Sequence, residues 1–234
     1  MSDLASGLGE AWRLLFGMDP EVWSIIALSL RVSLVATGIA LLLGVPVGAI
    51  LAMTRFPGHA LAVGGIYAGM GLPPIVAGLI VSVLLFRNGP FGALGLLYSP
   101  AAMVIAQAFI ATPVVAALSF SAMHALNPRY RLQLAALGAN KLQTAWWLLR
   151  EARLPLIAAV VAGFGAVISE VGAAMMVGGN IKGETRVLTT ATVLEVSRGH
   201  FDVAFALSFV LLFITYLVTF LLSLLQRQPH LARR

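Results

Sequence analysis

Cysteine is absent from this chain of 234 residues, so disulfides, thiolate metal sites and thiol chemistry are all excluded. Charged residues are scarce as well: Asp, Glu, Lys and Arg make up 10% of the chain, against roughly 25% in soluble domains. Hydrophobic residues make up 60%, and the mean hydropathy is +0.96. A water-soluble single domain is therefore excluded, and the composition predicts a polytopic membrane protein.

Motifs for catalysis and nucleotide binding are missing too. The sequence has no GxxxxGK[ST] phosphate loop, and the glycine-rich stretch 178–185 lacks the lysine in the required place, so we expect no ATP binding or hydrolysis by this chain. An intramembrane enzyme is disfavoured because HExxH and GxSxG are absent and all four histidines lie at or beyond the ends of apolar stretches. We therefore expect no catalytic residue, no metal site and no cofactor in this chain.

Five apolar stretches are long enough to cross a bilayer, which takes about 20 residues. They cover about residues 24–53, 60–86, 101–123, 154–177 and 203–225. The predicted fold is an all-α polytopic membrane protein with about five transmembrane helices. It divides into an N-terminal segment (1–22), a transmembrane domain (23–226) and a tail (227–234). The N-terminus lacks the basic region of a cleavable signal peptide, so we expect the first span to be retained.

Lysine and arginine counts predict how the spans are oriented. With the N-terminus outside, the inner segments hold nine of these residues and the outer segments hold five, and an excess of cations marks the cytoplasmic side. The nine are Arg55, Arg129, Arg131, Lys141, Arg150, Arg153, Arg227, Arg233 and Arg234, and the five are Arg13, Arg87, Lys182, Arg186 and Arg198. We therefore expect the N-terminus outside and the C-terminus in the cytoplasm. The net charge of +6 is read as this topology signal, not as a nucleic-acid surface.

Two GxxxG pairs, Gly44 with Gly48 and Gly65 with Gly69, predict close approach of helix backbones. The consecutive Pro73 and Pro74 must break or kink the second span. That bend is explained either by ordinary helix packing or by a bend that lines a path.

One stretch, 127–155, is both basic and amphipathic. Gly138 suits the left-handed position that ends a short helix, and Asn140 can cap a second one. Two such helices cannot bury their apolar faces alone. Spacing leaves two possibilities open: a helix pair in the bilayer interface anchored by Trp146 and Trp147, or a docking surface for another protein.

Residues 134–140, Leu-Ala-Ala-Leu-Gly-Ala-Asn, followed by Leu-Pro at 154–155, resemble the EAA loop of permease subunits of type I ABC importers. In that family the loop forms coupling helices that dock into a cytoplasmic ATPase. The leading Glu-Ala-Ala of the motif would fall on 132–134, where this chain has Leu-Gln-Leu, and the interval from glycine to proline is four residues longer, about one helical turn. The resemblance implies ATPase-coupling roles for Ala135, Ala136, Gly138, Ala139, Asn140 and Pro155.

Further stretches resemble the molybdate-type permeases in the same order along the chain. These are 71–78 with 87–92, and 169–173 with 177–181, while 182–190 looks most like the tungstate branch. The resemblance implies a permease subunit that passes tungstate or molybdate across a bacterial or archaeal plasma membrane. Implied partners are a second copy of the chain, two ATPase subunits that carry ATP and Mg²⁺, and an external substrate-binding protein. A secondary transporter or channel is the alternative, although the inverted repeats that would support it are not evident.

Glu170 is the only acidic residue placed within a predicted span, where an ionised side chain costs roughly 2.5–3.5 kcal/mol. A bare carboxylate on the path would repel an oxyanion. Three roles stay open for it: structural pairing or gating with Arg31 as a possible counter-ion, a solvated position, or direct substrate contact. The residues assigned to a pathway or gate are Glu170, Gly172, Arg31, Pro73 and Pro74.

The outer stretch 178–200 carries cations and hydroxyl groups. Cations at a pore mouth raise the local concentration of an anion, but nearby acids offset most of this charge, which favours a loop that docks the binding protein. The contact residues assigned on this side are Asn180, Lys182, Arg186 and Thr189.

Overall fold

The computed structural model describes Gly9 and residues 20–224, and in this part the chain forms helices and no strands. The predicted tail 227–234 and most of the segment 1–22 lie outside the described residues. The helices in chain order are α2 (Pro20–Met53), α3 (His59–Met70), α4 (Pro74–Leu85), the short 3-10 helix η1 (Gly92–Leu94), α5 (Pro100–His124), α6 (Pro128–Ala136), α7 (Lys141–Glu151), α8 (Arg153–Ile168), α9 (Gly172–Gly178), α10 (Leu188–Ser197) and α11 (Phe201–Leu224).

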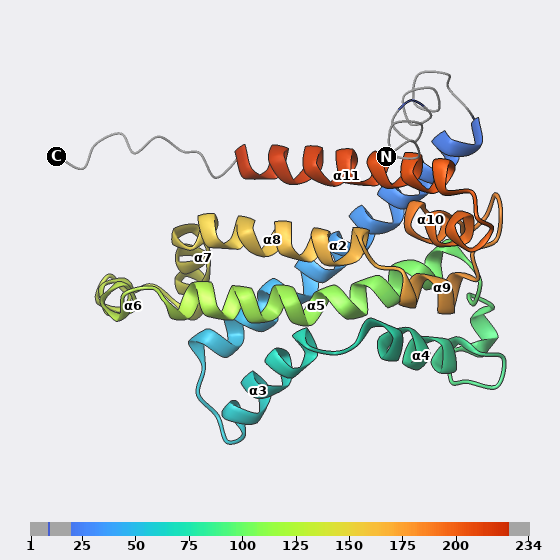
Figure 1. The fold of residues 1–234 in the computed structure, drawn as a ribbon. Coiled ribbons are helices and arrows are strands. Elements are labelled where there is room, and N and C mark those ends of the chain that lie inside the picture. The colour runs from blue at the N-terminus through green and yellow to red at the C-terminus, as the bar shows by residue number, and fades with distance from the viewer. Residues whose placement is uncertain (1–8, 10–19, 225–234) are drawn as a thin grey trace.

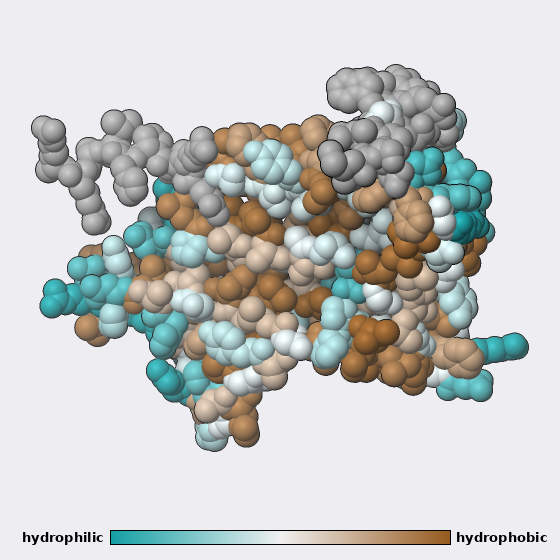
Figure 2. Space-filling view, viewed as in Figure 1, coloured by the Kyte–Doolittle hydropathy of each residue, from teal (hydrophilic) through white to brown (hydrophobic). Residues whose placement is uncertain are grey.

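Three of these helices, α2, α5 and α11, are each long and apolar enough to cross a membrane. Two bent pairs, α3 with α4 and α7 with α8, meet the same test when each pair is counted as one span, which gives up to five. Figure 1 shows α5, α8 and α11 running side by side, with α6 and α7 at one end and α9 and α10 at the other. Hydrophobic residues cover the middle of the molecule and hydrophilic ones gather at its two ends (Figure 2).

Two of the expected spans are not single helices. The stretch 60–86 bends by 102° between α3 and α4. Pro73 and Pro74 cause this break, since proline has no amide hydrogen for the helix ladder and disfavours helical geometry in the residue before it. The stretch 154–177 is interrupted as well, because α8 ends at Ile168 and α9 begins at Gly172.

Helices α2 and α5 pack closely because two residues at their contact are glycines, which have no side chain. A Cβ atom on Gly48 would lie 2.5 Å from the carbonyl oxygen of Ala116, and one on Gly44 would lie 2.9 Å from that of Thr112. The first GxxxG pair therefore sets how closely these two helices approach. In the second pair only Gly69 lies at a close contact between helices, because a Cβ atom there would meet Pro113. A Cβ atom on Gly65 would face open space.

The beginning of α10 is bonded to the beginning of α2. Ser29 donates its hydroxyl hydrogen to the carbonyl of Ile25 over 2.7 Å and accepts the amide hydrogen of Leu188 over 2.8 Å. The bond satisfies one of the amide groups that has no partner inside α10. The end of the molecule that carries α10 is thereby fixed to α2.

Candidate functional site

The stretch 127–155 folds as the predicted pair of short helices, α6 and α7, joined by a tight turn. Gly138 lies in that turn with φ +78°, the left-handed region that glycine enters without strain. Asn140 begins α7 with a capping box: its side chain accepts the amide hydrogen of Gln143, whose side chain accepts that of Asn140, both over 2.9 Å. The turn therefore has a defined shape built from local sequence.

Five of the six residues assigned to coupling come together at this turn. Ala135, Ala136, Gly138 and Asn140 are exposed and Ala139 is half-buried. Pro155 is also exposed but lies apart, in the first turn of α8. The neighbouring Leu137 is 83% exposed, a large apolar side chain that no described part of the chain covers. The turn therefore presents an apolar surface that the described residues leave uncovered.

A hydrogen bond from α6 and a packed side chain from α7 hold the α6–α7 pair to the rest of the molecule. Arg131 of α6 donates to the backbone carbonyl of Ala52 near the end of α2, whereas the bond from Tyr130 to Glu151, 3.4 Å long, ties α6 to α7 within the pair. Leu148 of α7 is 1% exposed and packs in a cluster with residues of α2 and α5, which are Ala49, Leu51, Ala52, Phe120, Ala122 and Met123. The α6–α7 pair is thus attached to the ends of two long helices, α2 and α5.

Glu170 lies in the break between α8 and α9, and its side chain forms a hydrogen bond to the start of α9. It is 8% exposed, and its carboxylate accepts the amide hydrogen of Ala173 over 2.9 Å at the start of α9. Its own backbone carbonyl accepts the hydroxyl hydrogen of Thr189 over 3.0 Å. A carboxylate at a helix N-terminus is stabilised by the amide dipoles around it, which accounts for an ionisable side chain at this depth.

The structure does not support Arg31 as the counter-ion. Within residues 20–224 no ion pair joins Arg31 to Glu170, and Arg31 lies on the exposed side of α2. The sequence left Arg31 as a possible counter-ion in one of three open roles for Glu170. The backbone amide of Ala173 supplies the stabilisation instead.

The two helix breaks lie next to each other. A Cβ on Gly172 would be 3.6 Å from the Cβ of Ile75, which follows Pro74, and a Cβ on Gly78 would be 2.7 Å from the Cα of Ala173. The small residues at the start of α9 thus pack directly against the start of α4. Of the assigned pathway residues, Glu170, Gly172, Pro73 and Pro74 therefore belong to one region, and Arg31 remains outside it.

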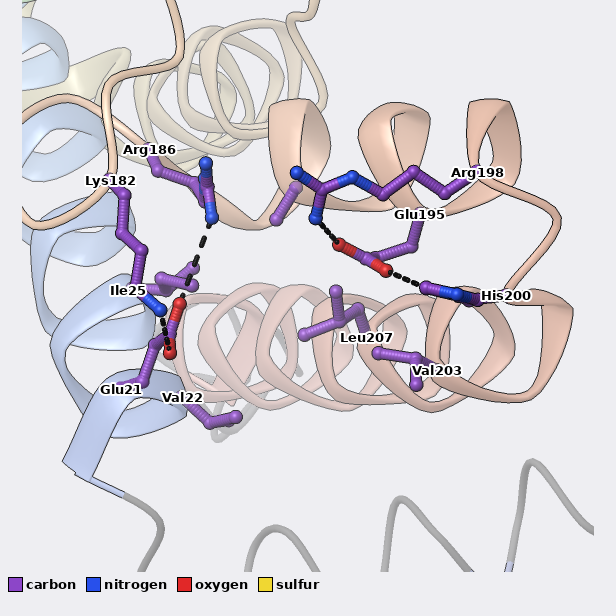
Figure 3. Close-up of a pocket in the computed structure, with 11 residues that line it drawn as sticks. Glu21, Val22, Ile25, Lys182, Arg186, Glu195, Arg198, His200, Val203 and Leu207 are labelled. Atoms are coloured by element: carbon purple, nitrogen blue, oxygen red, sulfur yellow. Dashed lines mark hydrogen bonds and ion pairs between the residues drawn. The ribbon is translucent and has the colours of Figure 1, made fainter.

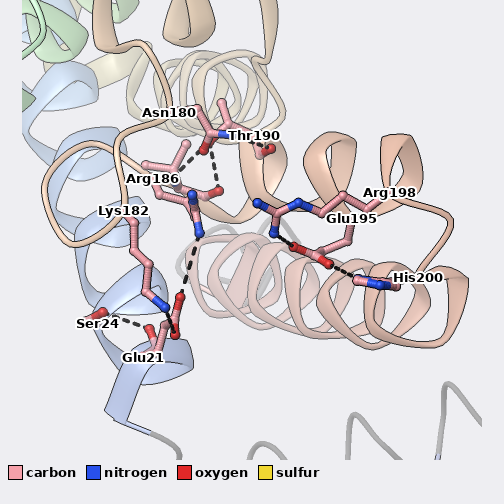
Figure 4. Close-up of polar contacts among 10 residues, drawn as sticks. Glu21, Ser24, Asn180, Lys182, Arg186, Thr190, Glu195, Arg198 and His200 are labelled. Atoms are coloured by element: carbon pink, nitrogen blue, oxygen red, sulfur yellow. Dashed lines mark hydrogen bonds and ion pairs between the residues drawn. The ribbon is translucent and has the colours of Figure 1, made fainter.

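Ion pairs hold the outer stretch, and one of the acids that form them, Glu21, was not indicated by the sequence. Glu21 at the start of α2 pairs with Lys182 over 2.6 Å and lies 3.7 Å from Arg186. Glu195 pairs with Arg198 over 3.0 Å and with His200 over 2.8 Å (Figure 4). These groups line a pocket of about 450 Å³ between α2, α10 and α11 (Figure 3). Glu21 lies more than 150 residues away from both partners in the sequence, so no local pattern could predict this pairing.

Among the residues assigned to contact a binding protein, Thr189 is misplaced. It is 6% exposed and its hydroxyl is bonded to Glu170, so it presents nothing to an external partner. Asn180 adopts a left-handed conformation with φ +53° and donates from its side chain to the carbonyl of Thr190. Lys182 remains well exposed, with 66% of its side chain accessible.

Comparison with known proteins places these features in a family context. Residues 44–231 match the family described as binding-protein-dependent transport system inner membrane component. The chain is 40% identical over 207 residues to the tungstate uptake system permease protein TupB of Peptoclostridium acidaminophilum, covering 88% of this chain and 91% of that one. It is 37% identical to a probable anion ABC transporter permease protein of Haloferax volcanii (79% and 82% covered) and 28% identical to the molybdenum transport system permease protein ModB of Escherichia coli (80% and 85% covered).

The fold is shared with solved structures. A chain of the inward-facing MetNI methionine ABC transporter superimposes with a TM-score of 0.73 at 19% identity, covering 92% of this chain and 96% of that one. A chain of an amino acid ABC transporter gives a TM-score of 0.66, also at 19% identity.

Proposed function

This chain belongs to the family of binding-protein-dependent transport system inner membrane components, and we propose that it is the permease subunit of an ATP-driven importer of tungstate or molybdate. Its relatives named for tungstate, molybdenum and anion transport support an oxyanion as the substrate. The observation that carries the proposal is the α6–α7 turn, an exposed surface attached to one end of the bundle.

We assign the docking of a separate ATPase to that turn. The exposed Ala135, Ala136 and Leu137 form a small apolar knob, and Gly138 lets the chain reverse without a side chain beside it. Because Arg131 bonds the knob to the end of α2, movement of the ATPase under the turn would reach the first long helix directly. The nine-to-five distribution of cations supports the cytoplasmic side for this end and an external N-terminus.

The region where α4 meets α9 is our candidate for a gate. Both helices begin at a break there, and the contact is made by small residues, Gly78 and Ala173. Broken helices leave backbone groups unpaired within a membrane unless they line a cavity or find partners. Glu170 supplies one such partner, so its role is to hold the break rather than to bind an anion.

The outer surface around Asn180, Lys182 and Arg186 is our candidate for contact with the substrate-binding protein. Glu21 neutralises part of its positive charge, which favours a protein-docking surface over an anion funnel. A complete importer would hold two copies of this chain, two ATPase subunits with ATP and Mg²⁺, and one binding protein, in a bacterial or archaeal plasma membrane.

The test is reconstitution of the chain in proteoliposomes with a candidate ATPase and binding protein encoded beside it. The proposal expects oxyanion uptake that requires ATP and the binding protein, together with stimulation of ATP hydrolysis. Uptake driven by an ion gradient, without ATP, would instead support the secondary transporter. Calorimetry of the binding protein with tungstate, molybdate and sulfate would identify the oxyanion.

A further inference from the structure

The beginning of α3 is hydrogen-bonded to the end of α2 through His59. The Nε2 atom of its ring lies 2.8 Å from the carbonyl oxygen of Leu51. A carbonyl oxygen only accepts, so Nε2 carries a hydrogen and donates it. The amide of Thr54 makes the last helical bond of α2, to Ile50, so the carbonyl of Leu51 has no donor within that helix. His59 therefore supplies the donor that a further turn of α2 would have supplied.

Two phenylalanine rings hold the ring of His59 in place. The Phe56 ring meets it edge to face with 5.4 Å between centroids, and the Phe120 ring of α5 lies 6.4 Å away. Tyr67, about two turns further along α3, meets the same Phe120 ring edge to face at 6.3 Å. Within residues 20–224, His59 makes the only hydrogen bond from a side chain of α3. The attachment of α3 thus combines one directional bond with ring contacts.

The α6–α7 pair is bonded to the next peptide group of α2. Arg131 donates to the carbonyl of Ala52, which directly follows Leu51. Leu148 of α7 and Leu134 of α6 belong to one apolar cluster that also includes side chains of α3. Those α3 residues are Ala62, Val63 and Ile66. A shift of the α6–α7 pair therefore acts at the point where α3 is attached.

Helix α3 is loosely packed between its two ends. The described residues bury none of its side chains fully, whereas α2 and α5 bury side chains from end to end. A helix with few buried contacts can move at low cost. Its far end rests on α5, since a Cβ on Gly69 would lie 2.7 Å from the Cβ of Pro113. The position of α3 thus depends on His59 at one end and on this contact at the other.

The far end of α3 leads into the candidate gate (Figure 1). After the 102° bend, α4 begins at Pro74 and packs at Gly78 against Ala173 of α9. Pro113 has no amide hydrogen, so the ladder of α5 lacks one bond where Gly69 rests on it. With 12 residues, α3 is about 18 Å long. Displacing its beginning while its far end rests on this weakened point of α5 turns the bend and moves α4.

We propose that His59 is a positioning residue that makes α3 follow the end of α2, and so passes movement of the α6–α7 pair to the contact between α4 and α9. This role rests on the function proposed above and adds the route from the docking turn to the gate. In that route Leu51 and Ala52 are neighbouring acceptors, one for α3 and one for α6. Loss of the His59 bond should leave the ATPase engaged while the gate no longer responds.

Two substitutions separate the hydrogen bond of His59 from the packing of its ring. H59F keeps a ring against Phe56 and Phe120 and removes the donor, whereas H59Q keeps a donor near the Nε2 position. In proteoliposomes with the ATPase and binding protein, H59F should keep ATP hydrolysis and lose about two- to tenfold in uptake per ATP hydrolysed, the range that one neutral hydrogen bond can bias. H59Q should restore the ratio.

A second histidine of the same cluster provides the control. His124 stacks on Phe120 with 5.3 Å between centroids, and H124F replaces one ring by another without touching the bond to Leu51. The ratio of uptake to hydrolysis should stay unchanged in H124F. Should H59F not reach the membrane, H59M removes the donor with a flexible apolar side chain and gives the same comparison.

Movement of α3 is measured with spin labels, since the chain has no cysteine to remove. One labelled pair is L61C on α3 with S121C on α5, and a second is L142C on α7 with S121C. All three positions are exposed. Labelled chains are diluted with unlabelled ones, so that distances within one chain are measured. Addition of ATP to the complex should change both distances in the unchanged chain and in H59Q, and only the distance from α7 in H59F.

Different results count against this role and against the function it rests on. An α3 distance in H59F that changes as in the unchanged chain, or an unchanged ratio of uptake to hydrolysis, would overturn the role of His59 and leave the docking turn in place. A lower ratio that H59Q does not restore would also overturn it, because the donated hydrogen would then not be what matters. A distance from α7 that stays constant in every chain would contradict ATPase docking at the turn, and the route with it.

Discussion

Arg131 donates a hydrogen bond from Nη2 to the backbone carbonyl of Ala52 over 2.9 Å. Ala52 lies in the last turn of α2, where carbonyl groups have no partner inside the helix and where the helix dipole favours a positive charge. This bond joins α6 to the first long helix of the bundle, beside the packing of Leu148 of α7 against the same end of α2.

Replacing Arg131 with Gln should weaken the link between movement of the α6–α7 turn and movement of α2. The bond to a charged donor contributes about 1.5–3 kcal/mol, and without it only the packing of Leu148 of α7 holds the pair to α2. We expect insertion to be unchanged and oxyanion uptake per ATP hydrolysed to fall several-fold in proteoliposomes. Arg129→Gln, which removes the same charge from the same helix, is the control. An unchanged ratio in Arg131→Gln would show that the contact carries no coupling.

Replacing Gly138 with Val should impair the same step through the backbone. A Cβ at Gly138 meets nothing within 4 Å, so the cost comes from φ +78° alone, about 1–2 kcal/mol for a residue other than glycine or asparagine. The turn should reshape while the bundle stays folded. We expect normal amounts of protein in the membrane, with weaker ATPase binding in a pull-down. Gly138→Asn, which tolerates this conformation, should bind as the unchanged chain does, and equal binding by all three would place the docking surface elsewhere.

Substitutions of Glu170 can show whether its negative charge or its hydrogen bond to Ala173 stabilises the fold. Because its carboxylate accepts the amide hydrogen of Ala173, Glu170→Gln keeps an acceptor in place, whereas Glu170→Ala loses the cap at a cost of about 0.5–2 kcal/mol. Thermal unfolding in detergent should show a lower Tm for the alanine variant and a nearly unchanged Tm for the glutamine variant. A large loss in Glu170→Gln would mean that the negative charge itself is required.

The α2–α5 contact predicts opposite effects for two glycines of one helix. Gly48→Ala places a methyl group 2.5 Å from the Ala116 carbonyl, so the helices must separate, at a cost of about 1–3 kcal/mol. Gly38→Ala meets nothing within 4 Å and gains up to about 1 kcal/mol from helix propensity. Thermal unfolding should therefore show a lower Tm for the first and an unchanged or higher Tm for the second. A similar Tm for both would show that the contact yields without cost.

Local chemistry accounts for what could be predicted from the sequence. The reversal at Gly138, the cap at Asn140 and the break at Pro73 each depend on a few adjacent residues, and the structure has them where the pattern indicated. The break after Ile168 was missed because no proline marks it. A run of apolar residues with one acid is typical of a continuous span, and only the folded structure shows that Glu170 lies just before a new helix and accepts the amide hydrogen of Ala173 in it.

Long-range pairing accounts for what could not be predicted. Glu21 meets Lys182 and Arg186 only after the chain has folded, so charge counting could show that acids offset these cations but not which acids do so. Thr189 was expected on the surface because it lies in a polar stretch. The start of α10 turns it inward onto Glu170.

The bond between Ser29 and Leu188 sets the order in which the molecule can be completed. The two residues are 159 positions apart, and a ribosome adds about 5–20 residues per second. Roughly ten seconds or more of synthesis therefore separate the insertion of α2 from the arrival of the amide that Ser29 accepts. During that interval α2 can pack on α5 through Gly44 and Gly48, while the hydroxyl oxygen of Ser29 has no Leu188 amide to accept from. The contact between α2 and α10 can therefore form only after the partners in the α2–α5 contact have both been made.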